Sequence, residues 1–344
     1  MTGNEKEEQK WLVPDYFGLF KCKCGECRNA CCKGWKIAIT EEEYFRMIGM
    51  DCSETLHQRI ESALVKIEFG TPDKFAYIVP DWRGQCRMLG DDGLCMLQKE
   101  CGEKAIPETC RVYPRSLKKT NGGYKAVLSA SCEAVVEILL SKDKIETGYL
   151  EAGDGLKPEI TESLPVDAEK LLKESLTIMQ DRGKSLYDRI VSVGNLFGIE
   201  NFNGFSLKGL LDILERLLET SDTLKEYSEG IYVRYGNGEG EAVKLYDSDF
   251  EAFKRNFPKW SIYFENLIVN NLIYASFPYC DKRIDKAKSF YGLVVQYEIM
   301  RLICTVNTLN NPGMDKLTDL IAAVYHLVEH TAFYYNASIS FEEV

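Results

Sequence analysis

The sequence of 344 residues lacks an uninterrupted apolar run long enough to cross a membrane. Its most apolar stretch, residues 260–279, is interrupted by Glu265, Asn266, Asn270 and Asn271, and such side chains are costly in a bilayer. The first residues are charged and polar and lack the apolar centre of a secretory signal. We therefore expect a cytoplasmic protein without a membrane span.

The sequence also lacks an excess of basic residues. It has 42 lysines and arginines against 53 aspartates and glutamates, which gives a net charge of −11. Binding along the phosphate backbone of a nucleic acid requires a basic face. We therefore expect no nucleic-acid partner.

Histidine is scarce, with 3 residues, whereas cysteine is abundant, with 13. Thiols in a reducing cytosol are seldom disulfides and more often metal ligands or catalysts. Five cysteines lie between Cys22 and Cys32, and only Cys280 and Cys304 lie beyond residue 132. This asymmetry predicts a cysteine-based site in the N-terminal part of the chain. The six cysteines between these two groups are Cys52, Cys86, Cys95, Cys101, Cys110 and Cys132.

The spacing and surroundings of these cysteines favour a metal site. Thiolates ligate zinc and iron–sulfur clusters, and a loop with a CxxC element can bring two sulfurs to one metal. Residues 81–115 show no long periodic apolar face, so a metal would replace burial as the organising contact there. The alternative is scattered buried thiols that act as small apolar side chains. The predicted ligands are Cys24, Cys27, Cys31, Cys32, Cys86, Cys95, Cys110 and Cys132.

Apolar periodicity predicts a mainly α fold with a minor β part. The polar stretch 141–163 suggests a boundary between a cysteine-rich, loop-rich metal-binding domain at 1–145 and an α-helical domain at 160–344. Residues 40–43 form a capping-box pattern that predicts a helix start. Helices of the second domain are expected at 167–180, 186–197, 207–218, 248–256, 259–275, 283–308 and 314–335.

Several segments resemble known families. The sequences CGECRNACCKGW (24–35), CRMLGDDGLCMLQ (86–98) and IPETCRVYPR (106–115) resemble a cysteine-rich domain described as zinc- or iron-chelating. With FPKWSIYFENLIVNNLIYASFPY (257–279) and VYHLVEH (324–330), nearly the whole chain resembles the flagellin lysine N-methylase (FliB) family. The resemblance implies ligation by seven of the eight predicted cysteines, the exception being Cys24, and it favours a 4Fe-4S iron–sulfur cluster over zinc.

The same resemblance implies an enzyme, a protein-lysine N-methyltransferase. It would transfer a methyl group from S-adenosylmethionine to lysine side chains of flagellin, its protein partner. The alternative is a zinc- or iron-binding protein without catalytic activity that recruits a protein partner. Measuring methyl transfer to flagellin distinguishes the two.

Two further features bear on a methyltransferase site. The turn GNGEG at 236–240, after a possible strand at 231–235, invites comparison with the Gly-rich donor loop of Rossmann-type methyltransferases, but a surface turn is favoured because no βα alternation follows. Glu265, Asn266 and Asn270 lie on an otherwise apolar helix, where they either bridge helices or line a pocket. We predict Glu265 as the catalytic residue that takes up the proton of the lysine amine.

Overall fold

The computed structural model describes residues 10–28, 31–121, 123–151, 158, 160–200, 202–219 and 224–342. The chain forms two compact units. The helical unit comprises residues 1–20, 115–131 and 135–344, and the cysteine unit comprises residues 21–114 and 132–134. This division differs from the predicted boundary at 145–160, because strands from both sides of that boundary pair in one sheet.

The cysteine unit contains a three-stranded antiparallel sheet in the order β2-β4-β3. Thr40 and Glu43 form the predicted capping box at the start of α1, and the Ser53 side chain caps α2. The elements of this unit are β2 (Ile37–Ile39), α1 (Glu41–Ile48), α2 (Glu54–Ala63), β3 (Leu64–Thr71), β4 (Lys74–Ile78), α3 (Met96–Cys101) and α4 (Glu108–Val112), with 3₁₀ turns at Cys24–Glu26 and Glu103–Ala105.

The cysteine unit has an apolar core of its own. Met47, Leu56 and Ile60 from its helices are fully buried in this core. The loop-rich stretch 81–115 contributes Met88 and Leu97, each 1% exposed. Apolar burial therefore helps to hold this stretch, which the sequence pattern alone did not indicate.

The helical unit carries a five-stranded mixed sheet in the order β7-β1-β6-β5-β8. β1 pairs parallel with β6 and antiparallel with β7, while β5 pairs antiparallel with β6 and parallel with β8. Two of these strands lie in the predicted linker at 141–163, whose residues 152–157 and 159 are outside the described ranges. The strands are β1 (Lys10–Pro14), β5 (Arg115–Thr120), β6 (Gly123–Leu128), β7 (Thr147–Glu151) and β8 (Ile160–Glu162).

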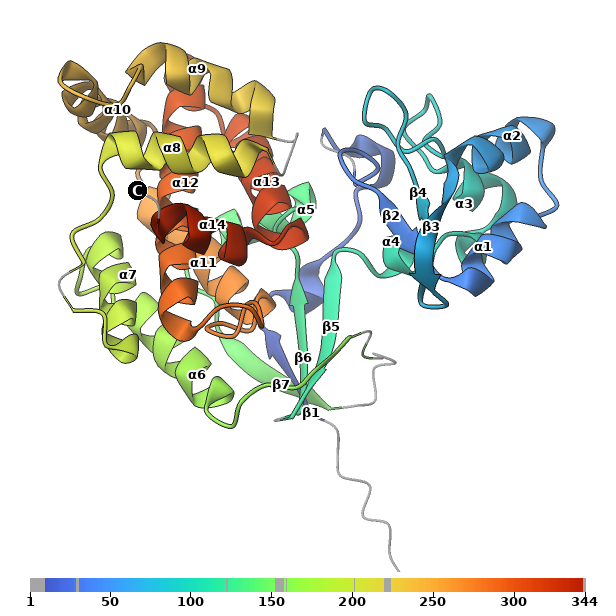
Figure 1. The fold of residues 1–344 in the computed structure, drawn as a ribbon, viewed down its shortest axis with the longest axis horizontal. Helices are drawn as coiled ribbons and strands as arrows, with labels where there is room; N and C mark the ends of the chain where they lie inside the picture. Colours follow the sequence, from blue (N-terminus) through green and yellow to red (C-terminus); the bar gives the residue numbers. More distant parts are fainter. Residues whose placement is uncertain are drawn as a thin grey trace, which may run out of the picture. The chain divides into compact units, whose positions relative to one another are not determined.

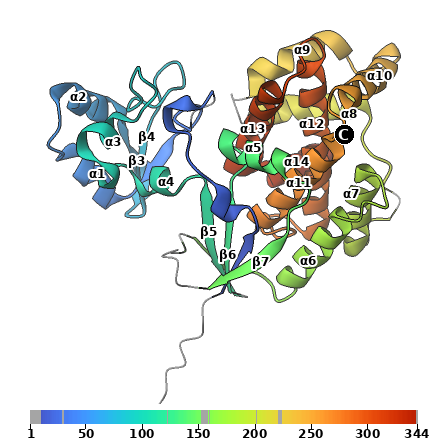
Figure 2. The same ribbon diagram turned by 180° about the vertical axis from the view of Figure 1, so that it is seen from behind.

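The remaining helices confirm the mainly α prediction. In Figures 1 and 2, α12 runs through the centre of the helical unit, where it contacts α7, α8, α9, α10, α13 and α14. The helices are α5 (Glu133–Ser141), α6 (Ala168–Met179), α7 (Leu186–Gly194), α8 (Leu207–Leu218), α9 (Lys225–Tyr235), α10 (Glu241–Asn256), α11 (Trp260–Tyr274), α12 (Lys286–Thr308), α13 (Met314–His330) and α14 (Phe333–Glu342), with 3₁₀ turns at Phe17–Leu19 and Asn195–Phe197.

The GNGEG segment is a turn between two helices. Residues 231–235 form the end of α9, and α10 begins at Glu241. Gly236, Gly238 and Gly240 have φ angles of 54°, 74° and 59°, a region that favours glycine. Because a helix precedes the turn, the comparison with a methyltransferase donor loop is wrong. No helix within the described ranges has the length and apolarity needed to cross a membrane.

Candidate functional site

Backbone hydrogen bonds in the cysteine unit bring three predicted ligands together. The N–H of Cys86 donates to the carbonyl oxygen of Cys32 at 2.6 Å. The N–H of Leu89 donates to the carbonyl oxygen of Cys86 at 2.9 Å, and Leu89 pairs with Cys95 in an antiparallel bridge. Two loops distant in the sequence are thereby fixed beside each other.

The thiols of this region affect one another's pKa values. A hydrogen bond from the Cys32 thiol lowers the pKa of Cys31 to about 7, and the same bond raises the pKa of Cys32. Burial raises the pKa of Cys86, with a further contribution from Cys95. Burial likewise raises the pKa of Cys110, and Cys86 and Cys31 add to the effect. Five predicted ligands therefore belong to one group, which we call the thiol cluster: Cys31, Cys32, Cys86, Cys95 and Cys110.

Glu43 fixes the helix that carries Cys110. The residue is 7% exposed, and its carboxylate accepts the N–H of Thr40 at 2.9 Å as part of the capping box of α1. Its other oxygen accepts the N–H of Glu108 at 2.7 Å, in the first turn of α4. One buried carboxylate thus ties the start of α1 to the start of α4, two residues before Cys110.

The other predicted ligands lie around the first cysteine loop. The N–H of Cys24 donates to the Cys22 sulfur at 3.3 Å. Burial raises the pKa of Cys22, and Cys31 of the thiol cluster contributes to the increase. Burial and the charge of Glu133 raise the pKa of Cys27 to about 11.

Glu133 links this loop to the segment that carries Cys132. Its buried carboxylate pairs with Lys23 at 2.5 Å and with Arg28 at 3.6 Å. Cys132 is half-buried and directly precedes Glu133. The ion pairs therefore join residues 23–28 to residues 132–133 within the cysteine unit.

The donor set fits a metal that prefers thiolates. The thiol cluster offers sulfur ligands, and soft sulfur ligands select zinc and iron–sulfur centres. In their described conformation, no three His, Cys, Asp or Glu side chains in the ranges given above converge closely enough to hold an ion. Ligation by the eight cysteines therefore stays a prediction.

The helical unit contains a cavity of about 710 Å³. Its wall comes from α7 and the turn before it, and from α10, α11 and α12. The aromatic side chains of the wall are Tyr187, Phe250, Trp260 and Tyr297. The charged side chains are Arg182, Lys184, Arg189, Lys254 and Arg301 against Asp247, Glu251 and Glu265.

Glu265 lies on this wall and is held by two arginines. Arg182 donates from Nε to Oε2 at 2.9 Å and from Nη2 to Oε1 at 2.8 Å. Arg189 donates from Nη1 to Oε2 at 2.6 Å. The Glu265 side chain is 1% exposed and both of its oxygens accept charged donors, so its contacts favour a positioning role. Proton uptake by Glu265 stays a prediction.

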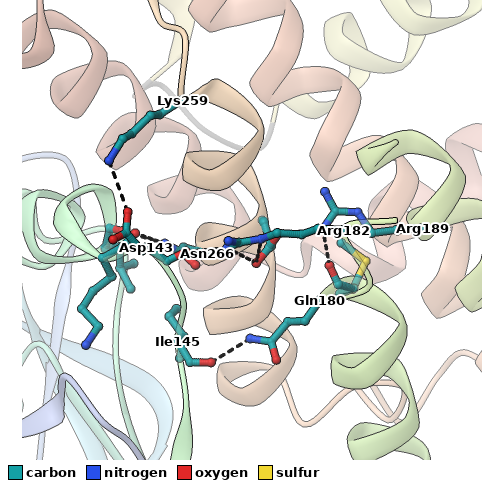
Figure 3. A network of polar contacts seen from close by, with 11 residues as sticks. Asp143, Ile145, Gln180, Arg182, Arg189, Lys259 and Asn266 are labelled. Atoms are coloured by element: carbon teal, nitrogen blue, oxygen red, sulfur yellow. Dashed lines mark hydrogen bonds and ion pairs between the residues drawn. The ribbon is translucent and has the colours of Figure 1, made fainter. Parts of the chain in front are cut away.

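The asparagines of α11 bridge elements of the helical unit. Asn266 donates from Nδ2 to the carbonyl oxygens of Leu139 at 3.1 Å and Lys142 at 2.7 Å, and Figure 3 shows its side chain beside the segment of Asp143. Asn270 donates to the carbonyl oxygen of Leu128 at 3.0 Å. The bridging interpretation is therefore the correct one for both asparagines.

Arg301 crosses the cavity wall from α12. It pairs with Glu298 at 3.5 Å and with Asp247 at 3.6 Å. Its guanidinium carbon lies 4.2 Å from the ring centre of Phe250 and 4.4 Å from that of Tyr246. Burial raises the pKa of Glu298, and Arg301 opposes this increase. The guanidinium is thus fixed between carboxylates and rings.

Sequence reasoning identified Glu265 but missed Arg182, Arg189 and Arg301. A glutamate on an apolar helix predicts a cationic partner. The sequence contains no signal that selects these arginines from the other basic residues, because their place on the cavity wall depends on the packing of segments that are far apart in the sequence.

Part of the chain matches a family model. The model described as "FliB lysine N-methylase C-terminal domain" matches residues 198–342. This range includes α10, α11 and α12 and therefore most of the cavity wall. No solved structure was found to match the chain.

Curated relatives match over 128 residues, which is 37% of this chain. The Lysine-N-methylase of Salmonella typhimurium is 27% identical there, and that of Salmonella choleraesuis is 26% identical. The flagellar biosynthetic protein FliU of Salmonella muenchen is 26% identical, and the match covers 75% of it. The match spans about a third of the two methylases, 32% of each. Residues 198–342 of this chain are therefore similar to the C-terminal domain of the FliB lysine N-methylases.

Proposed function

We propose that this protein transfers a methyl group from S-adenosylmethionine to lysine side chains of flagellin in the cytoplasm. The match of residues 198–342 to a lysine N-methylase domain carries the proposal. The names of the relatives, Lysine-N-methylase and flagellar biosynthetic protein FliU, support the reaction and a flagellar substrate. The cavity lies largely within the matched domain and has the size of a small-molecule site.

The polar reaction requires a neutral lysine amine, whose reference pKa is about 10.4. The nitrogen lone pair attacks the methyl carbon, an N–C bond forms, and the C–S electron pair goes to sulfur. The lysine proton passes to a base. Asp247 and Glu251, with side chains 70% and 59% exposed, are the acidic groups of the wall open to an incoming lysine, while Glu265 holds Arg182 and Arg189.

The cysteine unit would hold the metal. We propose ligation by Cys24, Cys27 and Cys132 together with the thiol cluster, and a 4Fe-4S cluster in preference to zinc. Such a centre supplies a cross-link between loops, and an iron–sulfur cluster also supplies one-electron chemistry. The hydrogen bond from the Cys32 thiol lowers the pKa of Cys31, which favours the thiolate form that binds metal.

The test measures transfer of labelled methyl from S-adenosylmethionine to purified flagellin by the full-length protein. Flagellin with chemically blocked lysines is the matched control. We expect label on native flagellin, on lysine, and none on the control. Binding of flagellin and metal without any transfer would instead establish the alternative, a metal-binding protein that recruits a partner.

A further inference from the structure

Three aromatic rings of the cysteine unit lie around one ammonium group. The nitrogen Nζ of Lys66 lies 5.0 Å from the ring centre of Tyr44 and 5.4 Å from that of Phe75. The ring centre of Phe45 lies 5.9 Å from the same nitrogen. A cation within about 6 Å of a ring centre is attracted by the negative face of the ring. We call these three rings, Tyr44, Phe45 and Phe75, the aromatic cage.

The rings of the aromatic cage pack against one another on two elements of the unit. Tyr44 and Phe45 lie on α1, and Phe75 lies on β4. The ring centre of Tyr44 is 5.3 Å from each of the other two, and those of Phe45 and Phe75 are 5.9 Å apart. The N–H of Glu41, at the start of α1, donates to the carbonyl oxygen of Pro72, in the turn before β4, at 2.8 Å. The rings are therefore held in place before any ligand binds.

The aromatic cage is open to solvent, and the cation in it is held without a carboxylate. Phe45 is 56% exposed, and Lys66 is exposed as well. Among the described residues no aspartate or glutamate forms an ion pair with Lys66. Contact with the rings is a weak interaction for an exposed ammonium. A cation that the rings bind more strongly can therefore displace Lys66.

A methylated ammonium is a cation of this kind. The unmodified ammonium of a lysine is compact and strongly hydrated. Each added methyl group replaces an N–H that donates to water, while the positive charge stays. Transfer from water to the faces of the rings therefore costs less, and the methyl groups add apolar contact. Aromatic cages recognise methylated lysines for this reason.

The strand that carries Lys66 offers a surface for the chain around such a lysine. β3 is at the edge of its sheet, and its register with β4 is interrupted between Lys66 and Thr71. Val65 and Phe69 on β3 are 48% and 95% exposed. An extended peptide can pair with an edge strand, and exposed apolar side chains add contact area. The surroundings therefore favour a segment of protein over a small free cation.

We propose that the aromatic cage binds a methylated lysine side chain of a protein, and that Lys66 occupies the cage until this ligand displaces it. The identity of the ligand as flagellin that this protein has itself methylated rests on the proposed function. Binding there keeps a methylated substrate on the protein while further lysines are modified.

The experiment measures binding of synthetic flagellin peptides to the full-length protein by calorimetry, without S-adenosylmethionine. The peptides have one sequence and carry dimethyl-lysine, lysine or acetyl-lysine at the same position. We expect the dimethyl-lysine peptide to bind about tenfold more tightly than the lysine peptide. The acetyl-lysine peptide should bind most weakly, because acetylation removes the charge.

Three variants locate the binding. Phe45→Leu removes the most exposed ring of the cage and should weaken binding of the dimethyl-lysine peptide about tenfold. Lys66→Ala empties the cage and should strengthen binding about threefold or more, because an occupied site lowers the apparent affinity. Misfolding cannot produce such a gain. Lys74→Ala is the matched control and should bind like wild type, since Lys74 lies over the ring of Tyr77, outside the cage. Thermal unfolding checks that each variant folds.

The outcomes separate this proposal from the proposed function. Binding of dimethyl-lysine that Lys66→Ala strengthens and Phe45→Leu weakens supports the cage, even if flagellin receives no methyl group. Methyl transfer to flagellin by a protein that binds the three peptides equally overturns the cage and leaves the function standing. Binding that Lys66→Ala leaves unchanged also overturns it, because the rings would then serve only to pack around Lys66.

Discussion

At the scale of single residues, the Glu265–Arg189 ion pair is a buried contact of the cavity wall. Both side chains are almost fully buried, and removing one partner of such a pair leaves an uncompensated charge that costs about 3–5 kcal/mol. Glu265→Gln keeps one acceptor, so we expect a loss at the lower end of that range. The variant should also lose methyl transfer, because Arg182 and Arg189 move.

Denaturant unfolding measures this loss of stability. Two further variants show whether it comes from the unpaired buried charge. Glu251→Gln changes a carboxylate of the same cavity that is largely exposed and should leave the unfolding midpoint unchanged. The double change Glu265→Leu with Arg189→Met should recover part of the stability, since no buried charge is left unpaired. If Glu265→Gln unfolds like wild type and yet abolishes transfer, proton uptake by Glu265 is the better explanation.

A second residue-scale prediction concerns Lys125. Burial and the charge of the neighbouring Lys118 lower the pKa of its side chain to about 7. Cys280 and Ser276 lie beside it, and Glu162 opposes the decrease. The unfolded chain keeps this proton up to a pKa of about 10.5, so between pH 7 and 10.5 the unfolded state binds more protons. Stability should therefore rise with pH in this window, by at most about 1.4 kcal/mol per pH unit.

Comparison with Lys125→Met checks the assignment. The free energy of unfolding of wild type, measured at pH 7, 8 and 9, should rise relative to that of the variant, because the variant lacks the group that titrates. Curves that stay parallel across these pH values would show that Lys125 keeps its charge when buried, balanced by Glu162.

At the scale of elements, Glu43 connects two helices of the cysteine unit through its two oxygens. Glu43→Ala removes the capping interaction of α1, worth about 1 kcal/mol, and leaves the first turn of α4 without its acceptor. We expect α4 to loosen and metal affinity to fall, because Cys110 is carried on α4. Thr40→Ala, which removes only the hydroxyl of the capping box, is the control.

The two variants should differ in metal content. Both variants destabilise α1, but only Glu43→Ala removes the acceptor that holds α4. The amount of metal bound per protein molecule after dialysis should therefore fall in Glu43→Ala alone. Equal metal content in both would mean that α4 is held without Glu43.

Prediction of helices from the sequence succeeded where the apolar pattern extended over a long segment. The helix expected at 259–275 is α11, and that expected at 283–308 is α12. The strands β7 and β8 were missed because their sequences, TGYLE and ITE, are short and polar and gain their pairing from the distant strands β1 and β5. β1 was missed because Lys10–Pro14 precedes the cysteines in a segment without periodicity.

At the scale of the whole molecule, the division into units could not be predicted from composition. The cysteines correctly marked one region, since ten of the thirteen lie in residues 21–114. β1 and β5, which lie on either side of this region in the sequence, pair with β7 and β8 beyond residue 145. Strand pairing over such distances is set by tertiary packing, which local sequence patterns do not encode.

The last prediction is that metal removal destabilises the cysteine unit and spares the helical unit. The cysteine unit has a small core built on Met47, Leu56 and Ile60, whereas its loops depend on a few backbone bonds and, on our proposal, on the metal. We expect Cys31→Ser and Cys95→Ser to lose metal and to exchange amide hydrogens faster in residues 31–114.

Hydrogen exchange measured by mass spectrometry on anaerobically purified protein tests this prediction separately for each of the two units. The control is Cys52→Ser, which changes a half-buried thiol outside the predicted ligands. In the ligand variants α11 and α12 should stay as protected as in wild type, because their core contains none of these cysteines. An absorbance spectrum separates an iron–sulfur cluster, which is coloured, from zinc. Full metal content and native protection in both ligand variants would mean that Cys31 and Cys95 pack as ordinary thiols.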